Sequence, residues 1–501
     1  MSKILHGGRL ANVREDVAHF TSSIKDDARL LDSVIAINKA HIVMLIEQKI
    51  LAKQDGAVLL TALVNASDIQ LDSSMEDVHM AVEEAILKEA GTEAGGNLHI
   101  AKSRNDQVAT AIRMTLRNEL LTLMRSLAHV QEHLAEVAED HLETVILEYT
   151  HLQPAQPVTF AHYLLSYVDA FQRDMQRLQN TYTRVNLSPL GACALATTSF
   201  PINRDLTAGL LGFKGLIENS IDAVGSRDFI EETLAALTLT AVTLSRLAED
   251  LIIWSSPDFG VVELPDEFTS TSSIMPQKKN PEVLEVIRAH ASHVLGNFVI
   301  VTATVKSLPS TYNLDFQEIT PKLWESIDNV RASLDMIHKL APKLKVTLDV
   351  SDKALKSFVA ATELANLLVR KYNIPFRSAH RIVGALVKSL IETKMTFADA
   401  TPKMLAKAAE DSTGIKLNVK TEDIKALADP LRLVEACKVK GGPAPAEVKR
   451  MLCEREKQVL QTKSDISKMD KELEESWNKL DAAVQQFISK TSKNTTFKNS
   501  T

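Results

Sequence analysis

Residues 228–254 read DFIEETLAALTLTAVTLSRLAEDLIIW, and this stretch decides the fold class. Its later part, LAALTLTAVTLSRLAEDLIIW, is apolar on almost every side of a helix with about 3.6 residues per turn. A helix that is apolar all round is covered by other helices and does not lie on a surface. We therefore expect residues 228–254 to form an inner helix of a bundle.

The same helical periodicity extends along most of the chain. Residues 118–147, NELLTLMRSLAHVQEHLAEVAEDHLETVIL, repeat apolar side chains at three- and four-residue spacing for about eight turns. Gly (17) and Pro (16) are scarce, and β-branched runs bounded by turn residues are few. We predict an all-α protein with an N-terminal helical domain at 1–106, a central long-helix bundle at 107–351 and a C-terminal helical domain at 352–501.

The end of the chain predicts one more long helix. Apolar residues recur there every seven positions, at Leu452, Val459, Ile466, Leu473, Leu480 and Phe487. The intermediate positions that a coiled coil needs to be apolar are mostly polar, as at Arg455, Thr462 and Ser476. We therefore expect an amphipathic helix docked on the body of the protein, followed by a frayed polar tail after Ile488.

Composition and charge exclude several classes of protein. The chain has 501 residues, of which 45% are hydrophobic and 24% charged, as is usual for a globular protein. The net charge of −7 gives no basic footprint for nucleic acid, and no apolar run reaches the roughly 18 residues of a membrane span. Cys193, Cys437 and Cys453 are too few and too widely spaced for a disulfide framework or a zinc site. We expect a cytoplasmic protein that binds neither nucleic acid nor a membrane.

A polar loop precedes one of the predicted helices. Residues 269–281 read TSTSSIMPQKKNP and end in a helix start, Asn-Pro-Glu, ahead of a helix predicted at 281–296. Backbone N–H groups at a helix N-terminus bind anions, and Lys278 and Lys279 add positive charge. A serine on such a loop can act as a general base if its alkoxide is stabilised. The plain alternative is a solvated Ser/Lys loop.

Three further polar segments lie where helical patterns begin or end. Residues 103–105, SRN, lead into a helix, and an arginine fork suits a carboxylate, although a helix cap by Asn105 or Asp106 also explains them. Residues 150–151, TH, follow a long helix, where a lone histidine is more often structural than catalytic. Residues 312–318, YNLDFQE, crowd polar groups beside another helix. Their shared position at helix ends favours a common site.

Together these segments resemble the motifs of the argininosuccinate lyase family, within the fumarase/aspartase superfamily. The motifs are SRNDQV, YTHLQPAQPVTF, SSIMPQKKNP and YNLDFQE, with support from NLSPLGACALATTSFPINRD, NSIDAVGSRDF and VRKYNIPFRSAHRIVG. The resemblance covers about residues 4–450. The combination of QKKNP with SRNDQV and YTHLQ favours this family over fumarase or adenylosuccinate lyase.

The resemblance implies an activity and a role for each motif residue. The reaction is the reversible cleavage of argininosuccinate to L-arginine and fumarate, the last step of arginine biosynthesis, by anti-elimination across a C–N bond without a metal or organic cofactor. Ser272 would remove the proton next to a carboxylate, and Lys278 would stabilise the resulting charge. His151, paired with Glu285, would protonate the leaving nitrogen or orient the substrate, and the reverse assignment of Ser272 and His151 stays open. The implied substrate-binding residues are Ser23, Ser103, Arg104, Asn105, Thr150, Asn280, Tyr312 and Gln317.

The family resemblance also implies a homotetramer around a core of long helices, in which three subunits contribute to each active site. Two alternatives are another fumarate-forming C–N lyase of the superfamily and a non-catalytic, crystallin-like structural homologue. The discriminating feature is the residue set, because Ser272, His151, Glu285, Arg104 and Lys278 are all present. That set favours an enzyme.

The sequence departs from the family pattern beside these motifs. Thr271 stands where a glycine is usual, and a β-branched residue resists a positive φ. We expect either that position 271 needs no positive φ or that the loop closes differently. Leu314 and Thr320 replace an arginine and a lysine of many members, with Lys322 as a candidate substitute. Residues 100–102, IAK, replace Thr-Gly-Arg.

Overall fold

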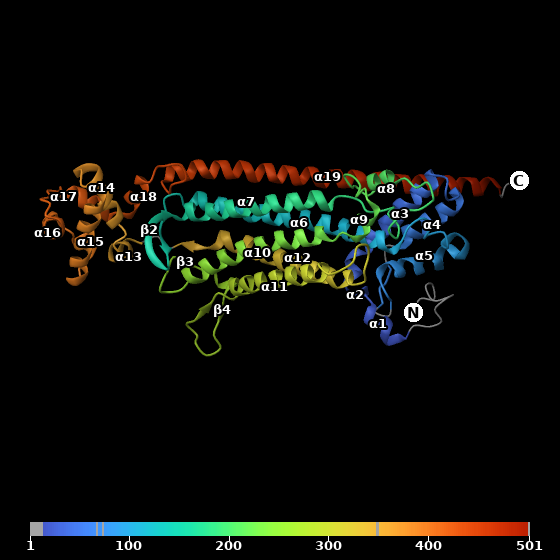
Figure 1. The fold of residues 1–501 in the computed structure, drawn as a ribbon, viewed down its shortest axis with the longest axis horizontal. Helices are drawn as coiled ribbons and strands as arrows, with labels where there is room; N and C mark the ends of the chain where they lie inside the picture. Colours follow the sequence, from blue (N-terminus) through green and yellow to red (C-terminus); the bar gives the residue numbers. More distant parts are fainter. Residues whose placement is uncertain (1–13, 67–68, 73–74, 347–349, 499–501) are drawn as a thin grey trace.

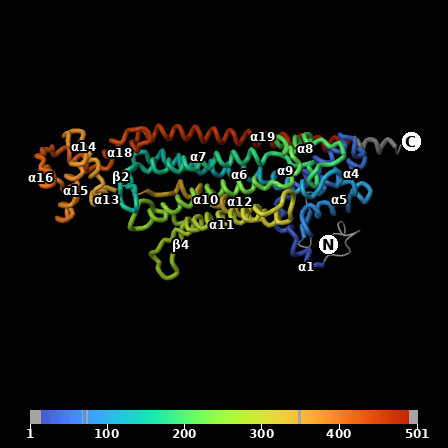
Figure 2. Tube along the Cα trace, viewed as in Figure 1, coloured from blue at the N-terminus to red at the C-terminus, as the bar shows by residue number. Residues whose placement is uncertain are grey.

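The computed structural model describes residues 14–66, 69–72, 75–346 and 350–498. The chain forms an elongated bundle of long helices with a smaller group of helices at each end (Figure 1). The N-terminal helices lie at one end, and the last helix runs back along the whole bundle (Figure 2). The all-α fold class predicted from the sequence is confirmed.

Long helices build the bundle, namely α6 (Arg104–Asp140), α7 (Phe160–Val185), α10 (Asp228–Trp254), α11 (Glu282–Val305) and α12 (Phe316–Leu340). The N-terminal end holds α1 (Glu15–Thr21), α2 (Ile24–Asp27), α3 (Leu31–Glu47), α4 (Lys53–Asn65) and α5 (Val78–Gly95), with α8 (Arg204–Leu210) and α9 (Ser220–Gly225) nearby. Short antiparallel pairs join β1 (Val145–Thr150) to β2 (Gln153–Thr159), β3 (Val262–Glu263) to β6 (Lys345–Val346), and β4 (Ser270–Thr271) to β5 (Lys279–Asn280). Single 3-10 turns lie at Ala28–Leu30, Asp266–Phe268, Ala341–Lys343, Phe397–Asp399 and Ala426–Ala428.

Helix α10 has the predicted bounds and packs against α7, α11 and α12. Its inner side chains, such as Leu234, Leu237 and Leu244, are at most 1% exposed. On another side of the helix Leu239 and Val242 are each 44% exposed in one protomer. The prediction of an inner helix is therefore confirmed for most of the surface of α10. One apolar strip of the helix, which contains Leu239 and Val242, is exposed.

The helix predicted over 118–147 is wrong at its C-terminal end. Helix α6 stops at Asp140, and the chain then turns into strand β1. Thr144, Val145 and Ile146 are β-branched, and such side chains favour extended backbone. Pairing of β1 with β2 in an antiparallel hairpin satisfies the backbone there, so a tertiary contact overrides the helical spacing.

The helix predicted over 281–296 also differs from α11 at both ends. Pro281 occupies the N-cap position without a side-chain cap, and Asn280 lies in the β4–β5 pair instead of capping the helix. The helix continues past Gly296 to Val305, because apolar residues keep their helical spacing there. A single glycine inside a long, packed helix was therefore too weak a stop signal.

A separate group of short helices follows the bundle, namely α13 (Ser351–Lys356), α14 (Ala361–Tyr372), α15 (Phe376–Glu392), α16 (Pro402–Thr413), α17 (Thr421–Lys425) and α18 (Pro430–Ala436). These helices bury their own apolar cluster around Leu364 and Leu386. Lys353 ties the group to the bundle by donating to the carbonyl groups of Asp258 (3.0 Å) and Phe259 (2.9 Å). The domain boundaries at 106 and 351 stay a prediction from the sequence.

The last helix, α19 (Pro445–Lys498), docks on the body of the protein, as predicted. Its heptad side chains are all at most 8% exposed, namely those of Leu452, Val459, Ile466, Leu473, Leu480 and Phe487. They pack against α4, α6 and α7, among other elements. The helix continues past Ile488 to Lys498, although the sequence predicts a frayed tail from there, and residues 499–501 lie outside the described residues.

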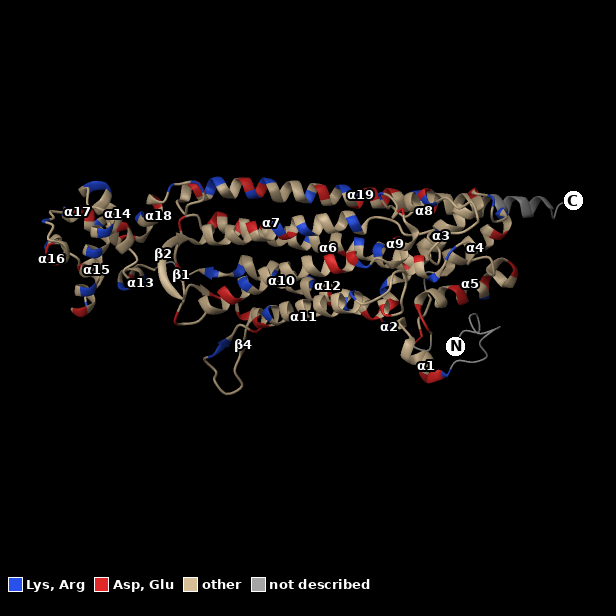
Figure 3. Cartoon of the chain, in the orientation of Figure 1, with Lys and Arg blue, Asp and Glu red and all other residues tan. Residues whose placement is uncertain are grey.

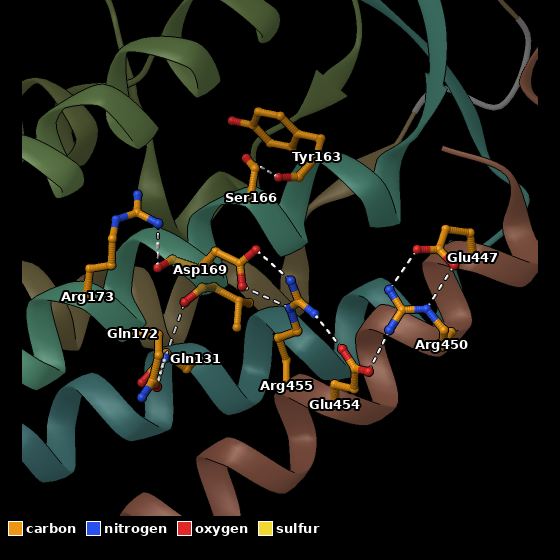
Figure 4. Close-up of polar contacts among 11 residues, drawn as sticks. Gln131, Tyr163, Ser166, Asp169, Gln172, Arg173, Glu447, Arg450, Glu454 and Arg455 are labelled. Atoms are coloured by element: carbon orange, nitrogen blue, oxygen red, sulfur yellow. Dashed lines mark hydrogen bonds and ion pairs between the residues drawn. The ribbon is translucent and has the colours of Figure 1, made fainter. Parts of the chain in front are cut away.

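Ion pairs follow the edge of the contact between α19 and α7 (Figure 4). Arg455 donates to both carboxylate oxygens of Asp169, each at 2.9 Å, and lies 3.2 Å from Glu454. Arg450 joins Glu447 to Glu454 on α19 itself. Charged residues recur along the helix (Figure 3). Because partly exposed ion pairs contribute little free energy, we infer that the buried heptad residues hold α19 in place.

We expect Leu480→Ala to lower the midpoint of urea unfolding, because removing a buried leucine side chain costs about 2–5 kcal/mol. Leu480 is 1% exposed, whereas Leu460 on the same helix is 62% exposed. Leu460→Ala is therefore the matched control and should change the unfolding free energy by less than about 0.5 kcal/mol. Circular dichroism follows the transition. Equal shifts for the two variants would contradict docking through the heptad face.

Candidate active site

A cavity of about 300 Å³ opens beside the N-terminal end of α6. Residues predicted to bind substrate line it, namely Ser23, Arg104, Asn105, Tyr312 and Gln317. They come from the N-cap of α2, the first turn of α6, and α12 with the segment that leads into it. The fold therefore brings together Ser23 and two of the four polar segments, 103–105 and 312–318, which are far apart in the sequence.

A buried carboxylate fixes the start of α6. Ser103 caps the helix, and Asp106 completes a capping box by accepting from the Ser103 N–H at 3.0 Å. The other oxygen of Asp106 accepts from the N–H groups of Gly191 (2.9 Å) and Cys193 (2.8 Å). Burial raises the pKa of Asp106 to about 6, although these three donors favour the carboxylate. The capping explanation is correct for Asp106 and wrong for Asn105, whose side-chain amide donates to the carbonyl of Ala194 at 3.0 Å. The cap places Arg104 in the lining of the cavity.

Acidic side chains that the sequence analysis did not single out also line the cavity. Arg104 forms an ion pair with Asp77 and lies 3.8 Å from Glu83. Ser23 Oγ donates to Asp27 at 2.5 Å. Burial raises the pKa of Asp27 to about 6. The cavity thus combines an arginine fork with several carboxylates and suits a ligand that carries both acidic and basic groups.

A sequence signal existed for only one of these carboxylates. Asp77 caps α5 by accepting from the Met80 N–H at 2.7 Å, and an aspartate before a helical pattern is a recognisable cap. Asp27 lies in a short helix with no pattern that marks it. Its presence at the cavity depends on how α2 packs near α5 and α6, and residue spacing does not encode the packing of one helix against another.

The segment before α12 closes one side of the cavity. Gln317 donates to the carbonyl of Thr21 at 3.0 Å, and the ring of Tyr312 lies 5.9 Å from that of Phe316. Burial raises the pKa of Tyr312. Behind this segment the buried guanidinium of Arg227 lies over the Phe316 ring, with its carbon 4.2 Å from the ring centroid. Ring packing therefore holds Tyr312 in place, and a hydrogen bond to Thr21 holds Gln317.

Both departures from the family pattern near this segment border the cavity. Leu314 and Thr320 line it, and the Thr320 hydroxyl donates to the carbonyl of Phe316 at 3.2 Å. Lys322, the candidate substitute for a missing cation, donates to Glu325 at 3.3 Å and is not among the described lining residues. The positive charge at this cavity therefore comes from Arg104.

Thr150 and His151 lie at the opposite end of the bundle. Helix α6 has 37 residues, so about 55 Å of helix separates Arg104 from the hairpin that follows. His151 (φ 55°) and Leu152 (φ 56°) form the two-residue tip of the β1–β2 hairpin, and both are left-handed. This conformation costs residues other than glycine roughly 1–2 kcal/mol each. The strained, exposed tip presents His151 outward from the protomer.

Ser272 lies on a loop that projects from the bundle beside the start of α11 (Figure 1). Its hydroxyl accepts from the N–H groups of Ile274 (3.3 Å) and Met275 (3.1 Å). Ile274 is 82% exposed, so the tip of the loop is uncovered in one protomer. Thr271 pairs with Lys279 in the β4–β5 ladder and has no positive φ, so its β-branched side chain fits there.

The remaining predicted residues near this loop are also accessible. Lys278 lies on the exposed part of the loop, and Glu285 lies exposed in the first turn of α11. No hydrogen bond joins Glu285 to His151 among the described residues of one protomer. The hydroxyl of Ser103, at the other end of the bundle, accepts from the Asn105 N–H at 3.4 Å, and Ser103 is not among the described lining residues. One protomer thus holds the predicted site residues in separate parts.

The described ranges lack two kinds of feature. In them, no cluster of three or more His, Cys, Asp or Glu side chains is arranged to hold a metal ion. Nor is any helix there both long enough and apolar enough to cross a membrane.

Comparison with solved structures defines the class of protein. EDDS lyase in complex with formate matches with a TM-score of 0.87 and 31% identity, over 96% of this chain and 97% of that chain. A class II fumarase from Schistosoma mansoni shares the fold alone, with a TM-score of 0.69 and 16% identity over 84% of this chain and 94% of that chain. Residues 16–296 match the family described as Lyase. The chain is a lyase of the fumarase/aspartase-like fold.

Sequence relatives narrow this class to one family. Residues 358–435 match the family described as Argininosuccinate lyase C-terminal. Argininosuccinate lyase of Methanocaldococcus jannaschii is 42% identical over 493 residues, which cover 97% of this chain and 99% of the relative. That of Methanothermobacter thermautotrophicus is 44% identical over 452 residues, 89% of this chain and 96% of the relative. The chain belongs to the argininosuccinate lyase family and is a carbon–nitrogen lyase. The resemblance seen in the motifs is confirmed.

We expect Asp106→Ala to lower the unfolding free energy by about 2–4 kcal/mol, because it leaves two buried N–H groups and one partly buried N–H group without their acceptor. Asp140→Ala is the matched control, since Asp140 is an exposed aspartate at the other end of the same helix. Its removal should change stability by less than about 0.5 kcal/mol. Urea unfolding measures both. A wild-type midpoint for Asp106→Ala would show that its carboxylate does not organise the start of α6.

Proposed function

We propose that this protein cleaves argininosuccinate reversibly to L-arginine and fumarate, the last step of arginine biosynthesis. One observation carries the proposal, namely that a member of this family places an arginine fork and several carboxylates around one cavity. Argininosuccinate has succinyl carboxylates at one end and the guanidinium and amino groups of arginine at the other. Mixed acidic and basic side chains complement such a substrate.

Substrate binding is assigned to two groups of residues. Ser103, Arg104 and Asn105, here named the carboxylate clamp, bind the succinyl carboxylates together with Thr150. An arginine fork binds a carboxylate through two parallel N–H bonds, which fixes its orientation. The arginine portion of the substrate contacts Ser23, Tyr312 and Gln317.

Ser272 is assigned the role of base. It removes the proton from the carbon beside a succinyl carboxylate, and the electron pair moves onto that carboxylate to give a dianion. The C–N bond then breaks, the electron pair forms the double bond of fumarate, and the leaving nitrogen takes up a proton. His151, oriented by Glu285, supplies that proton. Lys278 and Asn280 stabilise the dianion where its charge develops.

The surroundings of Ser272 support this role. Its hydroxyl already accepts from two backbone N–H groups, and the same donors favour an alkoxide. The loop leads to the N-terminus of α11, whose dipole also favours negative charge. The elimination as proposed requires no metal and no organic cofactor, because every proton transfer is assigned to a side chain.

The proposal requires several copies of the chain. Arg104 lies at one end of α6, and His151 lies beyond its other end, about 55 Å away. Helices α10 and α11 also expose apolar side chains, namely Leu239, Val242, Val286, Leu295, Val299 and Ile300, each at least 44% exposed. Burying this face against other copies is favourable. We infer a homotetramer in which three subunits contribute to each site. We also infer a cytoplasmic location, which suits the three free cysteines.

The activity is tested by adding argininosuccinate and recording the ultraviolet absorbance of fumarate. We expect absorbance to rise in proportion to enzyme concentration and L-arginine to form in equal amount. Absorbance with adenylosuccinate or aspartate, but none with argininosuccinate, would assign the chain to another fumarate-forming lyase. If a folded tetramer forms fumarate from none of these substrates, the result would favour the structural, crystallin-like alternative.

Sharing of sites between subunits is tested with two inactive variants. Ser272→Ala and His151→Asn should each lose nearly all turnover, because each removes a group that acts in the transition state. If the two residues come from different subunits, denaturing both variants together and refolding them should restore about a quarter of wild-type activity by random assortment. Each variant refolded alone is the control. Mixed tetramers that stay as inactive as the controls would indicate sites built within one chain.

A further inference from the structure

A buried lysine lies directly before the carboxylate clamp, and the proposed mechanism does not use it. Lys102 is 7% exposed, and its ammonium group donates to the side-chain oxygen of Asn38 on α3. The Asn38 amide group donates to the carbonyl of Val34 at 2.8 Å, which fixes its oxygen toward Lys102. The contact therefore joins α3 to the residue that precedes the N-cap of α6.

The ammonium group has no carboxylate in ion-pair contact among the described residues. The nearby anions are Glu83 on α5 and Asp106 on α6, and both raise the pKa of Lys102, whereas Arg104 lowers it. Both anions already have partners. Asp106 accepts three backbone N–H groups, and Glu83 lies 3.8 Å from Arg104 and 3.7 Å from the imidazole of His99.

The other titratable groups facing Lys102 are histidines, namely His41 on α3, His79 on α5 and His99 in the turn before α6. Burial lowers the pKa of His41 and His79 to about 3 and that of His99 to about 4, with the Lys102 charge adding to each shift. All three imidazoles are therefore neutral near pH 7. Burial lowers the pKa of Lys102 to about 7 and raises that of the neighbouring Asp106 to about 6, so above pH 7 Lys102 is the group in this cluster whose charge changes.

We propose that Lys102 is a positioning residue for the carboxylate clamp. Its ammonium group ties the start of α6 to α3 and, from behind Ser103 and Arg104, adds positive charge for the dicarboxylate portion of the substrate. Lys102 acts through its neighbours, because it is not one of the residues that line the cavity. The role rests on the proposed function, because it assigns the ligand of the clamp as a dicarboxylate.

This role predicts how substrate affinity depends on pH. A bound dicarboxylate stabilises the ammonium form, so binding raises the pKa of Lys102 and takes up a proton. Above pH 7 the free enzyme loses that proton, and binding must restore it. The dissociation constant therefore rises with pH above 7, by up to about tenfold per pH unit, until the pH reaches the pKa of the complex.

The test compares Lys102→Arg and Lys102→Met with wild type between pH 6.5 and 9, and uses fumarate as the dicarboxylate probe. For wild type we expect the KM for argininosuccinate and the calorimetric Kd for fumarate to rise several-fold between pH 7 and 8.5. Lys102→Arg should remove this rise, because the guanidinium stays charged. Lys102→Met should have a high, pH-independent KM with kcat changed much less. Lys88→Met, at an exposed position of α5, is the control and should behave as wild type.

A rise with pH in Lys102→Arg equal to that of wild type would overturn the proposal, as would a wild-type KM in Lys102→Met. If Lys102→Arg or Lys102→Met fails to fold, the KM values of the other variant are sufficient to test the proposal. A lysine with a purely structural role would lower stability without changing the pH profile. Failure of the proposed function is distinguishable from failure of this proposal. If the proposed function is wrong, argininosuccinate is not turned over at any pH, while the calorimetric Kd for fumarate still measures binding at the carboxylate clamp.

Discussion

A helix of 37 residues holds its two ends about 55 Å apart, and this rigid length governs the architecture of the protein. The carboxylate clamp lies at the start of α6, and His151 lies beyond its end. Helix α11 separates the loop of Ser272 from Tyr312 in the same way, over 24 residues or about 36 Å. A single chain therefore cannot complete the proposed site. The homotetramer that we propose would complete it, and the exposed apolar face of α10 and α11 is the surface that we propose for its assembly.

The carboxylates that cap the helix ends also position the residues around the cavity. Long apolar faces form the bundle, but the first N–H groups of each helix have no partner within the helix. Asp77 and Asp106 meet that need at α5 and α6, and the same carboxylates hold Arg104 and the turn at Gly191 in position. The cavity thus forms where capping has already concentrated charge. Burial then brings the pKa values of Asp27, Asp106 and Lys102 close to neutrality.

The elements that periodicity predicted best are those whose own sequence decides their burial. Helix α10 has the expected bounds because it is apolar on nearly all sides. Helix α19 docks on the bundle because its apolar heptad face is buried there. Strand β1 was not predicted, because Val145 and Ile146 fit either a helical face or a strand. Pairing with β2 decides in favour of the strand. The presence of Asp27 and Arg104 at the same cavity was not predicted for a similar reason, since each lies in an ordinary helical context.

The sequence by itself determined the all-α class, the amphipathic last helix, the absence of a basic footprint and, through its motifs, the family. Only the tertiary structure decided which motif residues meet. It joined Ser23, Arg104 and Gln317 in one cavity and kept His151 and Ser272 away from it. The physical reason is that periodicity records which face of each helix is buried, whereas packing decides which helix ends adjoin, and the chemistry of this protein lies at helix ends.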